Sequence, residues 1–250
     1  MPTNRFLANT KSCLRLLALL LLAVFPAAAQ FPDKFTNLKV FPKDISKADL
    51  MANMRRFAFA LGVRCQHCHV QTPDNKFDFP ADDKEPKRTA RAMLQMVAAI
   101  NRDYVGKLPK ASPLQVECVT CHHGLPQPRA LNAVLAEAIE KQGIDGAVKL
   151  YHDLREEYYG SGEYDFSETT LNQLTESLLA KNKTKEAVAI MELHFASNHP
   201  TTLWSYHMLA QAHRAAGDLE KTKDDFRKVL ELHPDDSWAK EQLEALSKPQ

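Results

Sequence analysis

Two copies of the pattern Cys-x-x-Cys-His constrain this chain more than any other feature. The first runs from Cys65 to His69 and the second from Cys118 to His122. Two thiols at this spacing can reach the two vinyl groups on one edge of a porphyrin, and the next side chain then lies under the iron. Each motif therefore predicts one covalently bound haem. The predicted thioether residues are Cys65, Cys68, Cys118 and Cys121, and the predicted proximal iron ligands are His69 and His122.

Two other uses of these cysteines are weighed against haem. A structural zinc site made from both pairs would not explain why a histidine follows each pair directly. Two disulfides are also conceivable, but a two-residue loop between bonded cysteines is tight and is typical of redox-active pairs. We therefore favour two haem c groups as the cofactors.

The N-terminus has the pattern of a secretory signal peptide. Three basic residues precede an apolar run from Leu16 to Phe25, and an Ala-x-Ala pattern ends at Ala29. We predict cleavage after Ala29, so that residues 1–29 are a signal peptide and the mature protein is periplasmic. The alternative is an uncleaved membrane anchor, although the run is short for a membrane-spanning helix.

Cleavage at this point leaves four cysteines. It removes Cys13, and all four that remain belong to the two motifs. No thiol is then left for a structural disulfide. This suits a c-type cytochrome in an oxidising compartment, because its thiols end as thioethers.

The two halves of the mature chain differ in charge. Residues 30–129 carry 16 Lys and Arg against 10 Asp and Glu, a formal charge of +6. Residues 130–250 carry 13 against 21, a formal charge of −8. The basic residues are scattered and lack interleaved aromatic side chains, so we expect no nucleic-acid partner.

A helix is predicted just before the first motif. Ser46 to Asp49 resembles a capping box, and Gly62 is placed to end the helix. Met54 lies on the apolar face of this helix. By spacing alone it is either a core residue or the sixth ligand of an iron, and the haem motif that follows favours the ligand.

A second amphipathic helix is predicted from Lys87 to Val105, after an exposed polar loop from Gln71 to Pro86. Met93 and Met96 share its apolar face, one turn apart. Both are candidate ligands for the second iron, and periodicity does not choose between them.

These stretches resemble one known family. The segment from Met54 to His69, the segment Arg91–Met96, and the segment from Val116 to Pro128 are similar to the cytochrome c subunit of photosynthetic reaction centres. The resemblance covers about Leu38 to Pro128. It implies a repeated unit of helix, turn and haem motif.

The resemblance also implies the sixth ligands. The family takes a methionine from the helix ahead of most motifs, which assigns Met54 to the first haem and Met93 to the second, with Met96 as the fallback. The family subunit carries four haems, whereas two motifs are present here. It also has an arginine where His123 follows the second motif.

The C-terminal part has a different pattern. His199-Pro200 and His233-Pro234 lie 34 residues apart, which is the period of tetratricopeptide repeats. We therefore expect a mainly α fold, with a dihaem cytochrome c domain over residues 30–129 and a tetratricopeptide-like helical domain over residues 130–250. The helical domain would either dock a protein partner or serve as a cap with no partner of its own.

The expected function is transfer of single electrons between redox partner proteins. Two irons with both axial positions filled leave no open site for a substrate, so we expect no enzyme activity. The partner would be a reaction centre or another electron-transfer complex, which could hold the protein at the outer face of the inner membrane. The alternatives are a peroxidase-like dihaem enzyme and an interaction protein with structural haems.

Overall fold

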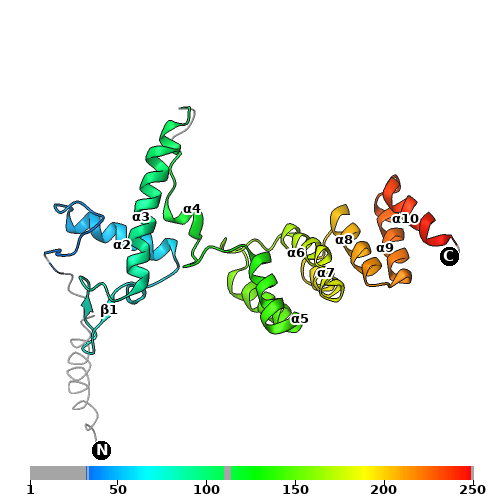
Figure 1. The fold of residues 1–250 in the computed structure, drawn as a ribbon, viewed down its shortest axis with the longest axis horizontal. Coiled ribbons are helices and arrows are strands. Elements are labelled where there is room, and N and C mark those ends of the chain that lie inside the picture. The colour runs from blue at the N-terminus through cyan, green and yellow to red at the C-terminus, as the bar shows by residue number, and fades with distance from the viewer. Residues whose placement is uncertain (1–31, 33, 110–113, 249–250) are drawn as a thin grey trace, which may run out of the picture. The chain divides into compact units, whose positions relative to one another are not determined.

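The structure is a computed structural model that describes residue 32, residues 34–109 and residues 114–248. The predicted signal peptide and Cys13 lie outside the described residues. The chain divides into two compact units, Met1–Arg56 with Arg64–Val116, and Phe57–Val63 with Glu117–Gln250. The described part is mainly helical, as predicted (Figure 1). Within it, no helix is both long enough and apolar enough to cross a membrane.

The first half combines two α-helices with short turns and strands. Its elements are α2 (Lys47–Ala60), the 3-10 turn η1 (Cys65–His67), β1 (Val70–Gln71), β2 (Phe77–Asp78), α3 (Glu85–Asp103), the 3-10 turn η2 (Val105–Lys107) and the short helix α4 (Cys118–His122). The second half is a run of consecutive helices. They are α5 (Leu131–Tyr158), α6 (Glu168–Ala180), α7 (Thr184–Asn198), α8 (Leu203–Ala215), α9 (Leu219–Leu232) and α10 (Ser237–Ser247).

Helix α2 begins and ends as its sequence predicts. The Ser46 hydroxyl accepts the backbone N–H of Asp49 at 3.0 Å, which satisfies one of the free donors of the first turn. At the other end Gly62 has a φ of 62°, a left-handed conformation that glycine adopts without the cost of a side chain. The helix therefore stops just before the first haem motif.

The segment predicted as a polar loop contains a hairpin. Strands β1 and β2 pair antiparallel, with Val70 opposite Asp78 and Gln71 opposite Phe77. The rings of Phe77 and Phe79 stack at 5.5 Å between centroids. The alternation of Phe77 and Phe79 is a strand signal, but the surrounding polar residues hide it in the sequence.

The second unit is a series of helices, each packed against its neighbours in the chain. Helix α6 packs on α7, α8 on α9, and each pair contacts the next helix along the chain (Figure 1). Helix α5 is interrupted at Gly143, which has a φ of 76°. The largest buried side chains of this unit include Tyr151, Leu171, Ile190 and Phe226.

The hydrophobic residues of these helices form two buried clusters. Ala210 and Phe226 are fully buried in one hydrophobic cluster, and Leu174 and Ala187 are buried in another. Gly217 lies in the turn between α8 and α9 with a φ of 82°. The assignment to the tetratricopeptide repeats themselves stays a prediction.

A buried hydrogen-bond network joins three of these helices. His194 on α7 is fully buried; its Nε2 lies 3.0 Å from the Ser205 hydroxyl of α8, and its Nδ1 lies 3.1 Å from the Asn198 amide nitrogen. The Ser205 hydroxyl donates to Glu168 of α6 at 3.0 Å. The ring therefore acts as a neutral donor and acceptor at once, and burial lowers the pKa of His194.

This network predicts a pH-dependent stability. The folded pKa of His194 lies below the value of 6.5 that the unfolded chain has, so the unfolded state takes up the proton first. The free energy of unfolding should be highest above pH 6.5 and should fall as the pH drops below that value. Urea titrations at several pH values should show this slope in the wild type and a smaller slope in His194→Gln.

The matched control for this slope is His199. It is exposed and lies at the left-handed C-cap of α7, outside the network. His199→Gln should keep the wild-type slope. An unchanged slope in His194→Gln would show that the buried ring does not cause the effect.

Candidate haem-binding sites

The first motif folds as one tight turn. The backbone N–H groups of Cys68 and His69 both donate to the carbonyl of Cys65, at 3.2 and 2.9 Å. Arg64 enters this turn in an extended conformation. The two thiols and the imidazole are thus held within a single turn of backbone, as attachment along one porphyrin edge requires.

The second motif forms the short helix α4. Its N-terminus has a reciprocal cap, in which Glu117 and Thr120 each accept the backbone N–H of the other. Its C-terminus is His123, in a left-handed conformation with a φ of 48°. His123 is exposed. His67, in the first motif, is half-buried.

The predicted proximal histidine of the second motif is held by a hydrogen bond through its ring. The Nδ1 atom of His122 lies 2.8 Å from the carbonyl oxygen of Leu125, and Leu125 is buried. A carbonyl can only accept, so Nδ1 carries the proton and Nε2 is left with its lone pair. Metal-bound histidines are commonly fixed in one tautomer by such a bond.

The first proximal histidine has a different environment. Its Nδ1 is buried and makes no hydrogen bond with any described residue. The ring packs edge-on against Phe79 at 5.0 Å between centroids. Burial lowers the pKa of His69, as does the positive charge of Lys87, and these effects outweigh the opposite effect of the Phe79 backbone. The imidazole is therefore neutral, the form that binds iron.

All four motif cysteines are free thiols in the structure. Burial raises the pKa values of Cys68 and Cys118. Among the described residues, no three His, Cys, Asp or Glu side chains are grouped as a metal-ion site would need.

The candidate sixth ligands all lie in the first unit. Met54 is half-buried on α2, in the same unit as the first motif. Met93 and Met96 on α3 are 40% and 48% exposed. The second motif belongs to the other unit, so the pairing of either α3 methionine with His122 remains a prediction.

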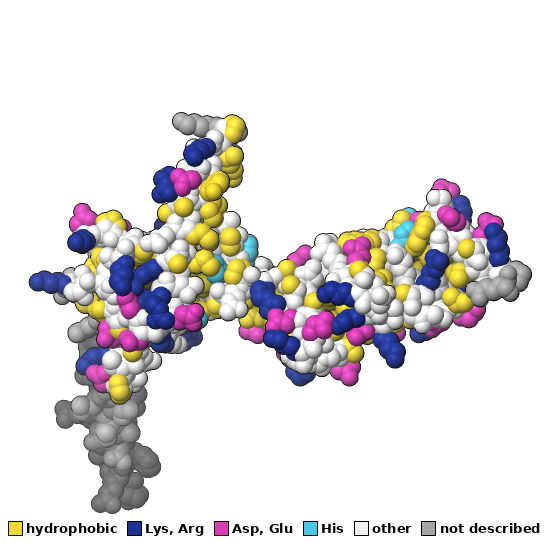
Figure 2. All heavy atoms as spheres, viewed as in Figure 1, with side chains coloured by type: hydrophobic (Ala, Val, Ile, Leu, Met, Phe, Trp, Pro, Cys, Tyr) yellow, Lys and Arg dark blue, Asp and Glu magenta, His cyan; other side chains and the backbone are white. Residues whose placement is uncertain are grey.

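The first unit has little core of its own. Among its described residues, Leu50 is the one hydrophobic residue that is buried. Hydrophobic side chains line α3 and continue past its end (Figure 2). The large exposed ones of this unit are Met93, Met96, Tyr104, Leu108 and Leu114. A flat apolar group such as a porphyrin fits these residues because it would cover surface that the protein leaves in water.

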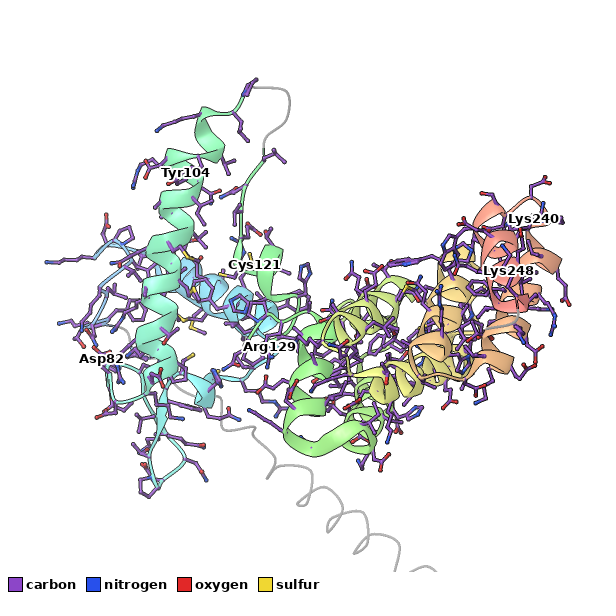
Figure 3. All side chains as sticks on the ribbon, turned by 45° about the vertical axis from the view of Figure 1, so that its right-hand side comes forward. Asp82, Tyr104, Cys121, Arg129, Lys240 and Lys248 are labelled. Atoms are coloured by element: carbon purple, nitrogen blue, oxygen red, sulfur yellow. The ribbon has the colours of Figure 1, made fainter. Side chains whose placement is uncertain are left out.

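A cluster of ion pairs holds the segment that precedes α3. The carboxylate of Asp82 accepts from Lys39 at 2.6 Å and from Arg91 at 2.7 Å, and it lies 3.2 Å from the Lys87 ammonium. The hydrogen bond from Lys39, with one from Asn37, holds the pKa of Asp82 far below its usual range. Asp82 lies at the N-terminal end of α3 and Tyr104 near its C-terminal end (Figure 3).

Lys87 and Asn101 are functional candidates that the sequence pattern did not assign. Lys87 is buried and donates to three backbone carbonyls next to the His69 ring. Asn101 binds both backbone groups of Val116, each at 2.8 Å, and so fixes the chain just before the second motif. In the helical period Lys87 lies well away from the face of Met93 and Met96, so no local signal marks its burial. No local signal marks the role of Asn101.

Paired thiols and a histidine within one turn, repeated twice, define a c-type cytochrome. A family model described as the photosynthetic reaction centre cytochrome C subunit matches residues 23–208. This match spans most of the chain, which therefore belongs to that family. Membership implies that haem c is bound covalently.

One relative is similar to part of the chain. It is cytochrome c-554 of Chloroflexus aurantiacus, which is 35% identical over 98 residues, equal to 39% of this chain and 22% of the relative. The chain thus spans about a fifth of the length of that relative. No solved structure matches the chain significantly.

Proposed function

We propose that this protein is a periplasmic dihaem cytochrome c that passes single electrons between redox partner proteins. The observation that carries this proposal is that two complete motifs each fold as one turn, with thiols and histidine together. Haem c supplies one-electron chemistry when bound. Residues 30–129 would form the haem domain, as predicted from the sequence.

Each named residue has a defined role in this proposal. The four motif cysteines hold the two cofactors through thioethers, and His69 and His122 supply the proximal nitrogens. Met54 and Met93 supply the opposite ligands, as the family resemblance implies. Methionine opposite histidine fills both axial positions and raises the reduction potential, so the chain supports electron transfer rather than substrate turnover.

The partners are proposed by class. Family membership favours a reaction centre or another electron-transfer complex at the outer face of the inner membrane. The C-terminal helices offer a docking surface for such a partner, because stacked helix pairs present extended surfaces. A peroxidase-like enzyme is the alternative, and it would require an iron with an open axial position.

The test is the absorption spectrum of the ferric protein, matured in a periplasm that attaches haem. The wild type should show low-spin haem and a charge-transfer band from methionine to iron. Met93→Ala should lower that band by about half, because one of two ligated methionines is lost. Met96→Ala is the matched control and should leave the band unchanged. High-spin haem in the wild type would reject the closed electron carrier and favour the enzyme.

A further inference from the structure

The two motifs have local charges of opposite sign. Two lysines are bonded to backbone at or beside the first motif, whereas two glutamates contact the backbone of the second. Ferric haem carries one more positive charge than ferrous haem, so a nearby cation favours the reduced state and an anion the oxidised state. The difference therefore bears on the two reduction potentials.

The cations at the first motif are held in place. Lys84 donates to the carbonyl of Gln66, which lies between Cys65 and Cys68. The Lys87 ammonium donates to the carbonyls of Phe79, at 2.7 Å, and Ala81, at 2.6 Å. Its side chain is 11% exposed, so water screens its charge weakly.

The nearby carboxylate does not cancel these charges. Asp82 lies 3.2 Å from Lys87, but it also binds Lys39 and Arg91 at shorter distances. Its single negative charge is thus shared among three cations. The group keeps a net positive charge even before Lys84 is counted.

The anions at the second motif are equally local. Glu117 caps the first turn of α4 next to Cys118. Glu163 packs against Gly124, since a Cβ on Gly124 would lie 2.8 Å from Glu163 Oε1. The other oxygen, Oε2, is buried and has no hydrogen-bond partner among the described residues. Gly124 lies two residues after His122.

The hydrogen bonds of the two proximal histidines act in the same direction. His122 donates to Leu125 O at 2.8 Å, which makes the imidazole a stronger electron donor and favours the oxidised iron. At His69 the Nδ1 atom has no hydrogen-bond partner among the described residues, and the Phe79 carbonyl, whose hydrogen bond raises the pKa of His69, also accepts from Lys87 at 2.7 Å. Charge and hydrogen bonding thus both favour the reduced state more at the first motif than at the second.

We propose that the haem on Cys65 and Cys68 has the higher reduction potential of the two, and that Lys87 is the residue that raises it most. This inference rests on the proposed dihaem function and orders the two centres within it. One electron from a redox partner protein would therefore reduce the first iron from ferric to ferrous before a second electron reduces the other iron, and no bond or proton is transferred.

The test is a redox titration of the full-length holoprotein followed by visible absorption. The wild type should show two one-electron waves. Lys87→Met should lower the midpoint potential of the upper wave by about 59 mV, which corresponds to a tenfold change in the equilibrium constant of reduction. Lys87→Arg should restore it because the charge returns. Lys76→Met is the control, since Lys76 is exposed at the hairpin turn, and it should leave both waves in place.

Two further variants keep the test decisive if Lys87→Met fails to mature. Lys84→Met should also lower the upper wave, and Glu163→Gln should raise the lower one. The inference is overturned if the lysine variants act on the lower wave or move neither, or if Glu163→Gln does not raise the lower wave. Fewer than two haems, or a high-spin haem, would instead reject the proposed function.

Discussion

Gly62→Ala is expected to destabilise the holoprotein by more than about 3 kcal/mol and to reduce haem content at the second motif. Gly62 has a φ of 62°, and a Cβ there would lie 2.0 Å from the carbonyl oxygen of Gly124. The same turn is tied by a bond from Gly124 N–H to Ala60 O at 2.9 Å. Alanine would therefore force backbone apart just after His122.

Gly160 provides the matched control for this prediction. It also has a positive φ, 81°, but nothing lies within 4 Å of its would-be Cβ. Gly160→Ala should therefore lower the free energy of unfolding only by the cost of placing alanine in a left-handed conformation, about 1–2 kcal/mol. Guanidinium unfolding followed by circular dichroism, with haem content measured per chain, compares the two. An equal loss of unfolding free energy in both variants would show that the contact between Gly62 and Gly124 does not contribute to stability.

Preventing haem attachment should unfold the first unit and spare the C-terminal helices. With all four motif cysteines changed to alanine, α2 and α3 have two buried hydrophobic residues, Leu50 and Ala60, between them in the described structure. Helices of this length are marginal in water without tertiary packing. Helices α5 to α10 keep their own buried clusters.

Hydrogen exchange measured by mass spectrometry resolves this outcome by segment. In the variant, amides of α2 and α3 should exchange at nearly unfolded rates, whereas α6 to α9 should stay protected as in the holoprotein. Strong protection of α3 without haem would mean that the first unit has a core of its own. Loss of protection in α6 to α9 would mean that the helical segment depends on the haem unit.

The features that the sequence predicted correctly are local. The motifs themselves, the cap at Ser46 and the end of α2 at Gly62 each depend on residues within one or two turns. The mainly helical fold follows from apolar periodicity in the same way. Such patterns are readable because the interacting residues are neighbours in the chain.

The features that the sequence could not show depend on contacts between distant residues. Two motifs of the same pattern give no sign that Nδ1 of His122 finds a carbonyl acceptor and Nδ1 of His69 does not. The burial of Lys87 depends on a loop that folds back over the start of α3. In that loop Asp82 forms ion pairs with Lys87 and with Lys39, which is distant in the sequence. Glu163 reaches Gly124 from beyond α5. Composition and residue spacing do not predict these contacts between distant parts of the chain.

The central claim is that each motif carries one covalent haem. Its most direct test is the denatured intact mass of the exported protein, alone and with Cys118 and Cys121 both changed to alanine. The account predicts the mass of the mature chain plus two haems for the wild type, and plus one haem for the variant. A wild type that retains one haem or none after denaturation would contradict it.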